Sequence, residues 1–162
     1  MSTKKFAIII GVFVGAILLL IIIGALSGGQ KPAEKIAPIL QRNLNMRAGS
    51  DVARNQAGDF ELRVSAASAS IIIASDNTPL SEYFAANFQL PPPAVEKDFT
   101  DKLNSITETS VFDSEYNNFM RERLQNNLDA LADLINQSDD ANLKAILQTM
   151  RQNQTELLEE FN

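Results

Sequence analysis

The clearest pattern in this chain runs from residue 110 to residue 135 and reads SVFDSEYNNFMRERLQNNLDALADLI. Apolar side chains recur in it three or four residues apart, a spacing that places them on one face of an α-helix. Ser110, three residues before Asp113, resembles a capping box at the start of this helix. The predicted buried stripe consists of Phe112, Tyr116, Phe119, Met120, Leu124, Leu128, Leu131, Leu134 and Ile135. Such a helix needs partner helices to cover its apolar face.

The residues that follow predict the first of these partners. Ser138 and Asp139 are typical caps of a helix N-terminus. Beyond them the apolar residues again share one face, and they are Leu143, Ile146, Leu147, Met150, Leu157, Leu158 and Phe161. Because the connection is short, we expect the two helices to pack antiparallel as a hairpin.

The segments before residue 110 also carry helical patterns, interrupted by proline and glycine. Residues 33–74 indicate one long or broken helix, with weak points at Pro38 and at residues 48–51, where Ser50 is able to cap a restart. Its predicted apolar series is Ile36, Leu40, Leu44, Val52, Phe60, Val64, Ala67 and Ile71.

Two shorter helices are predicted next. Thr78 and Pro79 are typical of an N-cap and a first helical residue, and they introduce a helix with an apolar face of Leu80, Tyr83, Phe84 and Phe88. The three prolines at 91–93 then form a stiff spacer. After it, Val95, Phe99, Leu103 and Ile106 share one helical face.

No repeat of fixed period and no β-hairpin signal is visible in the sequence. The predicted fold class is therefore all-α, with an N-terminal single transmembrane helix followed by a small helical bundle of about four or five helices. The expected domain organisation is a short tail at 1–5, a transmembrane helix at 6–26, a hinge at 27–32 and a bundle at 33–162, with a proline linker at 90–94 inside it.

The transmembrane prediction depends on the run from Phe6 to Leu26, which contains no polar or charged side chain. As a helix these residues span about 31 Å, which matches a bilayer hydrocarbon core of about 30 Å. A cleavable signal peptide ending at residues 25–27 is the alternative, but its apolar region is usually shorter, about 7 to 15 residues. Gly11 and Gly15 have the GxxxG spacing of pairing membrane helices, although glycine is frequent in such helices in any case.

The orientation follows from the charges around this run. The tail before it is short and carries Lys4 and Lys5, which resist translocation, whereas longer domains cross largely regardless of charge. We therefore expect the N-terminus in the cytoplasm and the C-terminal domain outside it. Without these two lysines, 12 basic and 20 acidic residues remain, a formal charge of −8 that disfavours nucleic acid as a partner.

The residue types present also limit the chemistry that this chain can carry out. Histidine, cysteine and tryptophan are absent, which removes the commonest general base, the thiol nucleophile and the usual zinc ligands. The doublets Asp139-Asp140 and Glu159-Glu160 are better explained by helix ends and a solvated face than by catalysis or a metal site. We therefore expect no enzyme activity, no cofactor and no metal.

Asparagine and glutamine are frequent in the predicted helices, where they are interpreted mostly as solvated surface. The residues concerned are Asn43, Asn45, Asn117, Asn118, Asn126, Asn127, Gln152, Asn153 and Gln154. The alternative is that such neutral faces bind a partner through hydrogen bonds.

These observations lead to two functional hypotheses. The first is a membrane-anchored helical domain that acts by protein–protein interaction, as a structural or accessory subunit of a cell-envelope complex. Its partners would be the lipid bilayer and another membrane or envelope protein, or a second copy of the chain. The alternative is a ligand-sensing helical bundle that signals through a partner. A hydrolase using serine and acids is disfavoured by the missing histidine and by the absence of a G-x-S-x-G elbow.

Overall fold

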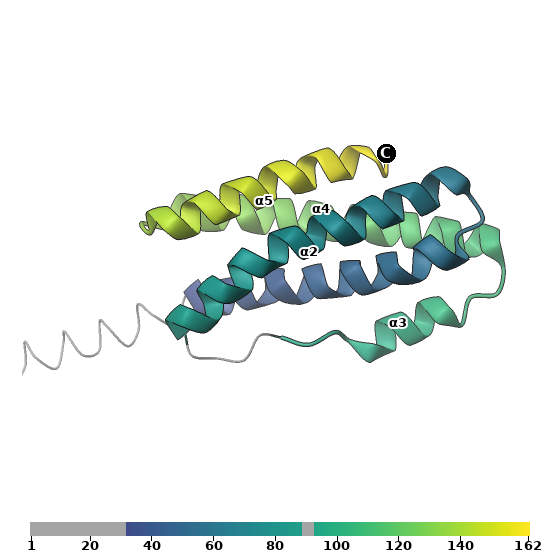
Figure 1. Ribbon diagram of the computed structural model, residues 1–162, viewed down its shortest axis with the longest axis horizontal. Helices are drawn as coiled ribbons and strands as arrows, with labels where there is room; N and C mark the ends of the chain where they lie inside the picture. Colours follow the sequence, from purple (N-terminus) through teal and green to yellow (C-terminus); the bar gives the residue numbers. More distant parts are fainter. Residues whose placement is uncertain (1–31, 89–92) are drawn as a thin grey trace, which may run out of the picture. The chain divides into compact units, whose positions relative to one another are not determined.

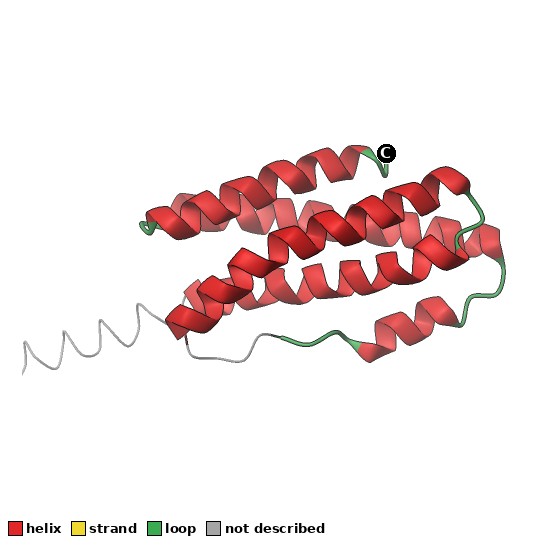
Figure 2. Cartoon of the chain, in the orientation of Figure 1, coloured by secondary structure: helices red, strands yellow, loops and turns green. Residues whose placement is uncertain are grey.

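The computed structural model describes residues 32–88 and 93–162, and in these ranges every regular element is a helix (Figure 1, Figure 2). A first helix, described over residues 32–56, is followed by α2 (Phe60–Phe88), α3 (Lys97–Asn104), α4 (Thr109–Gln137) and α5 (Ala141–Glu159). Residues 35–162 form one compact unit. The predicted all-α bundle is confirmed for these residues.

Within the part of the chain that the structure describes, no helix combines the length and the apolar character needed to cross a bilayer. The predicted transmembrane segment, residues 6–26, lies outside the described residues, and so do Gly11 and Gly15. The membrane anchor and its pairing therefore stay predictions.

The four long helices pack around a common interior. Side chains of the first helix form hydrogen bonds to α2, α4 and α5, and α5 packs against both α4 and α2. Residues 138–140 connect α4 to α5, so the predicted hairpin is confirmed (Figure 1). Asp140 caps α5, one residue later than predicted, because its Oδ1 accepts hydrogen bonds from the N–H groups of Asn142 and Leu143 at 2.8 and 2.9 Å.

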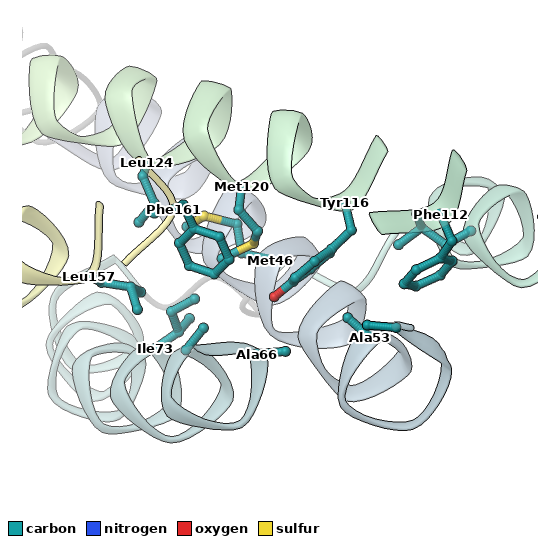
Figure 3. Packing of buried hydrophobic residues seen from close by; sticks show 13 residues of the cluster. Met46, Ala53, Ala66, Ile73, Phe112, Tyr116, Met120, Leu124, Leu157 and Phe161 are labelled. Carbon is teal, nitrogen blue, oxygen red and sulfur yellow. The ribbon is translucent and has the colours of Figure 1, made fainter. Parts of the chain in front are cut away.

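Aromatic residues fill one region of this interior. Tyr116 of α4 is fully buried, and its ring lies 6.3 Å from that of Phe112 and 5.8 Å from that of Phe161 (Figure 3). Its hydroxyl lies 2.8 Å from the hydroxyl of Ser50, so the buried polar end of the ring is satisfied. We call Phe112, Tyr116 and Phe161 the aromatic layer.

The first helix continues past the predicted weak point at residues 48–51, and the predicted restart at Ser50 is wrong. The Ser50 hydroxyl donates instead to the carbonyl of Met46 inside the helix, at 2.8 Å. With this carbonyl and Tyr116 as partners, a buried serine costs little in mid-helix.

The chain turns at residues 57–59 instead. The N–H groups of Gly58 and Asp59 donate to the carboxylate of Asp113 at 2.9 and 3.0 Å, which ties the turn to α4. Asp59 in turn accepts from the N–H of Glu61 at 2.8 Å at the start of α2. The predicted capping box with Ser110 does not form, because α4 begins at Thr109 and Ser110 already lies inside the helix. The N-cap of α4 is Glu108, which makes no side-chain cap.

α2 differs from its prediction in two ways. It runs through Thr78 and Pro79 without a new start, and the Thr78 hydroxyl donates to the carbonyl of Ala74 at 3.1 Å. A proline inside a helix costs about 3 kcal/mol, which burial of Leu80 and Phe84 just beyond it offsets. The predicted burial of Leu80 and Phe84 is confirmed, but in the first half of α2 the core-facing residues are Ala66, Ala69 and Ile73 and not those of the predicted series.

Candidate functional site

The two acidic doublets noted in the sequence, Asp139-Asp140 and Glu159-Glu160, lie at the two ends of α5. Asp140 caps α5, and these cap hydrogen bonds from backbone N–H groups, together with Tyr83, lower the pKa of its carboxyl group. Glu159 and Glu160 are exposed at the end of α5. Among residues 32–88 and 93–162, no three acidic, histidine or cysteine side chains are grouped to hold a metal ion.

Three buried amide side chains meet in the interior of the bundle. Asn43 of the first helix, Asn127 of α4 and Gln154 of α5 are fully shielded from solvent. The Asn127 amide donates to the side-chain oxygens of Asn43 and Gln154 at 2.6 and 3.2 Å, and Gln154 donates to Asn43 at 3.3 Å. We call these three residues the amide cluster. It links three helices through directional bonds.

The amide cluster also reaches the fourth long helix and the surface. Asn43 donates to the side-chain oxygen of Asn77 on α2 at 3.3 Å. On the other side, the half-buried Arg42 donates to the side-chain oxygen of Asn127. All four long helices therefore share one hydrogen-bonded polar group.

The interpretation of these amides as solvated surface is wrong for four of the nine residues, since Asn43, Asn45, Asn127 and Gln154 are buried. The sequence did contain a signal for two of them. Asn127 lies in register with Met120, Leu124, Leu131 and Leu134, and Gln154 lies in register with the buried positions of α5. A polar residue at an apolar position of a helical repeat is expected to be buried and paired.

Next to the amide cluster lies a buried carboxylate. Asp76 of α2 is only 3% exposed, and one of its oxygens, Oδ1, accepts from the Asn153 amide at 2.7 Å. The other oxygen, Oδ2, is buried and has no hydrogen-bond partner among the described residues. Burial raises the pKa of Asp76 to about 6, although the amides of Asn153 and Gln154 lower it in part.

Asp76 lines a pocket of about 340 Å³ between α2 and α5. The pocket also contains polar groups from Ser75, Thr149 and Asn153. Its remaining lining residues are Pro79, Ala145, Ile146 and Met150. Polar acceptors beside an apolar wall are typical of a small-molecule site, and the volume is at the lower end of the usual range of about 300–1,000 Å³.

A second candidate surface lies on α2, facing away from the core. Phe60, Val64 and Ile71 are 69%, 54% and 72% exposed. At 100° per residue these positions fall within a sector of about 40°, opposite the buried Ala66 and Ile73. We call Phe60, Val64 and Ile71 the outer stripe. Their assignment to a buried face in the sequence was therefore wrong, because α2 has apolar residues on both sides and only one side faces the core.

Two arginines form a third unusual group. Burial, and then the positive charge of Arg123, lowers the pKa of Arg42. The Nε atom of Arg123 is buried without a hydrogen-bond partner in the described part of the chain, and its guanidinium lies 5.6 Å from the centre of the Phe119 ring. The pocket beside Arg123 also contains Glu115 and Glu122, which would repel an anion. This group is therefore a weaker candidate than the Asp76 pocket.

Comparisons with protein-family models, with curated proteins and with solved structures find no match for this chain. The candidates are therefore judged by geometry and chemistry, and two of them are suited to binding: the outer stripe of α2 and the Asp76 pocket.

Proposed function

We propose that this chain acts by protein–protein interaction, and that the outer stripe of α2 binds a helix of a partner protein. The observation that carries the proposal is the exposure of Phe60, Val64 and Ile71 on one side of a helix whose other side is buried. Apolar residues gathered on one exposed face are more typical of an interaction surface than scattered single ones. A helix packed along α2 would contact all three, since i, i+4 and i+11 positions form a continuous ridge.

The charges beside the outer stripe indicate what kind of helix fits. Glu61 is exposed on α2, and Glu160 of α5 lies at the edge of the stripe, where it accepts a hydrogen bond from Ser68 at 3.3 Å. Ala67 and Ser68 lie between the large apolar residues and allow close approach of another helix. On the other side of the outer stripe, the guanidinium of Arg63 lies 5.8 Å from the centre of the Phe60 ring. We therefore expect a partner helix with lysine or arginine along one edge of its apolar face, facing Glu61 and Glu160, and an acidic residue along the other edge, facing Arg63.

The predicted anchor at residues 6–26 would tether the helical domain to a bilayer. In that arrangement the chain would serve as a structural or accessory subunit of a cell-envelope complex, with its helical domain outside the cytoplasm. No active site is needed for this role.

A photo-crosslinking experiment tests the proposal. A photoreactive residue is placed at position 64 of the full-length chain in its native cells, and the crosslinked proteins are quantified by mass spectrometry. The matched pair of variants is Ile71→Asp, on the outer stripe, and Val111→Asp, an exposed apolar position on α4.

We expect one reproducible partner protein whose crosslinked amount falls at least tenfold in Ile71→Asp and stays the same in Val111→Asp. Equal amounts in both variants would refute the outer stripe as the docking surface. Crosslinks found only between copies of this chain would show that the outer stripe binds a second copy and not a different protein.

A second function is favoured by a separate observation, the pocket beside the buried, unpartnered oxygen of Asp76. In this alternative the bundle is a sensor, and a small molecule between α2 and α5 changes how the two helices pack. The amide cluster next to the pocket would transmit the change, because Gln154 is one residue from Asn153 and bonds to two other helices.

A further inference from the structure

The chemistry of the Asp76 pocket indicates what it would bind. The first observation is the buried Oδ2 atom of Asp76, which has no donor among the described residues although its side chain is 3% exposed. A buried carboxylate oxygen without a hydrogen bond is costly, and such atoms in native proteins call for an explanation. A ligand that donates a hydrogen bond would remove this cost.

The second observation comes from the backbone of α2. Pro79 has no N–H group. The carbonyl of Ser75 therefore lacks the donor that the residue four positions later normally supplies in an α-helix. Ser75 and Pro79 both line the pocket, next to Asp76. The Ser75 carbonyl, which has no i+4 donor, and the unpartnered oxygen of Asp76 therefore belong to adjacent residues that line one site.

Two of the other polar residues of the pocket use a donor inside the protein, while the Ser75 hydroxyl and the second amide hydrogen of Asn153 remain as neutral donors. The Thr149 hydroxyl donates to the carbonyl of Ala145 at 3.1 Å, which leaves its lone pairs as acceptors. Asn153 uses an amide hydrogen on Asp76. No lysine or arginine is among the described residues that line the pocket. The site thus offers several acceptors and one carboxylate without a cationic partner, together with apolar lining residues that include Ile146 and Met150.

We propose that this pocket binds a small aliphatic amine, with its ammonium group against the Asp76 carboxylate and its alkyl chain against Ile146 and Met150. An ammonium group has three N–H donors and no acceptor, which matches a site that offers acceptors. The alkyl chain accounts for the apolar lining, which a bare cation would not use. This inference rests on the second candidate function and specifies the class of its ligand.

Isothermal titration calorimetry and thermal unfolding of the full-length chain test the inference. The probe is n-butylammonium chloride, with 1-butanol as the neutral molecule of matching size and potassium chloride as the control for ionic strength. The variants are Asp76→Asn, which keeps the shape and removes the charge, and Asp129→Asn, an exposed acid on α4. Because Asp76→Asn removes a buried charge, we expect this variant to fold.

We expect n-butylammonium to bind the wild type and Asp129→Asn equally and to raise the unfolding temperature of both, and to bind Asp76→Asn at least tenfold more weakly. Equal binding to Asp76→Asn would overturn the inference. Equal binding of 1-butanol and n-butylammonium would also overturn the inference, because the charge would then play no part. The pocket would still be a binding site, and the sensor function would stand. If neither compound nor a screen of metabolites binds, both the ammonium site and the sensor function are refuted.

Discussion

The aromatic layer and the amide cluster are two parts of one interior, about 16 Å apart along α4, and they hold the helices together in different ways. Around Tyr116 the contacts are apolar and non-directional, and the one polar atom is paired with Ser50. Around Asn127 the contacts are hydrogen bonds between amides of three helices. Apolar packing contributes more stability, whereas directional bonds select one register of the helices, since an unpaired buried amide is costly.

The largest effect is expected from emptying the aromatic layer. Tyr116→Ala should lower the free energy of unfolding by about 3–5 kcal/mol, because it leaves a cavity between Phe112 and Phe161. Urea denaturation measures this loss in the free energy of unfolding. The control Tyr116→Phe removes only the hydrogen bond to Ser50 and should cost about 1 kcal/mol. Equal losses in the two variants would show that the ring itself contributes little.

A smaller effect is expected from breaking the amide cluster. Asn127→Leu leaves Asn43, Gln154 and Arg42 without their shared partner, so it should cost about 1–3 kcal/mol in urea denaturation. Replacing Asn43, Asn127 and Gln154 together by leucine should cost less than this single change, because none of the three buried amides is then left unpaired, and Arg42 and Asn77, which lose a partner, are only half-buried. If the losses in free energy of unfolding of the three single variants add up to the loss of the triple variant, the cluster is not a cooperative unit.

The pH dependence of stability should show the contribution of Asp76 separately from those of the aromatic layer and the amide cluster. The pKa of Asp76 is about 6 in the folded protein and 3.8 ordinarily, so the folded state binds this proton more tightly than the unfolded state. Asp76 therefore destabilises the fold above pH 6, and this cost disappears as the pH falls from 6 towards 4. We expect Asp76→Asn to be more stable than the wild type at pH 7.5, by about 1–2 kcal/mol.

The measurement is urea denaturation of both proteins from pH 4 to pH 8. Their difference isolates Asp76 from the other carboxylates, including Asp140, whose lowered pKa acts in the opposite direction. A constant difference across this range would contradict the raised pKa.

The smallest effect is expected on the outer stripe. Ile71→Ser should change the free energy of unfolding by no more than about 0.5 kcal/mol, because Ile71 is 72% exposed. The matched variant Ile73→Ala, two residues along the same helix, should cost about 2–5 kcal/mol, since Ile73 is fully buried. Comparable losses in the two variants would mean that Ile71 is covered, as in a stable dimer.

Much of the helical structure was predictable from local pattern. The apolar stripe of α4 was read correctly at Phe112, Tyr116 and Leu124, and the hairpin to α5 followed from its short connection. Helix ends were less predictable, because Ser50, Thr78 and Ser110 carry the residue types of caps but are not used as caps. Their hydroxyl groups found other partners within the fold.

The candidate site was not predictable to the same degree. The pocket is made by residues of α2 and α5 that lie far apart in the sequence, such as Asp76 and Asn153, which are 77 positions apart. Asn127 and Gln154 interrupt the apolar repeats of their helices, and a polar residue at such a position is a signal of burial rather than of a solvated surface. The partner that makes burial of Asn127 tolerable, Asn43, comes from the first helix, 84 residues earlier.

The sequence by itself determined that the described part of the chain is helical and which stripes of α4 and α5 are apolar, because periodicity is a local property of consecutive residues. Only the tertiary structure decided which side of α2 faces the core. Both sides of that helix are apolar, and the choice depends on the helices that pack against it. The same holds for Asp76 and the amide cluster, since burial of a polar group is tolerated only where distant segments supply its hydrogen bonds.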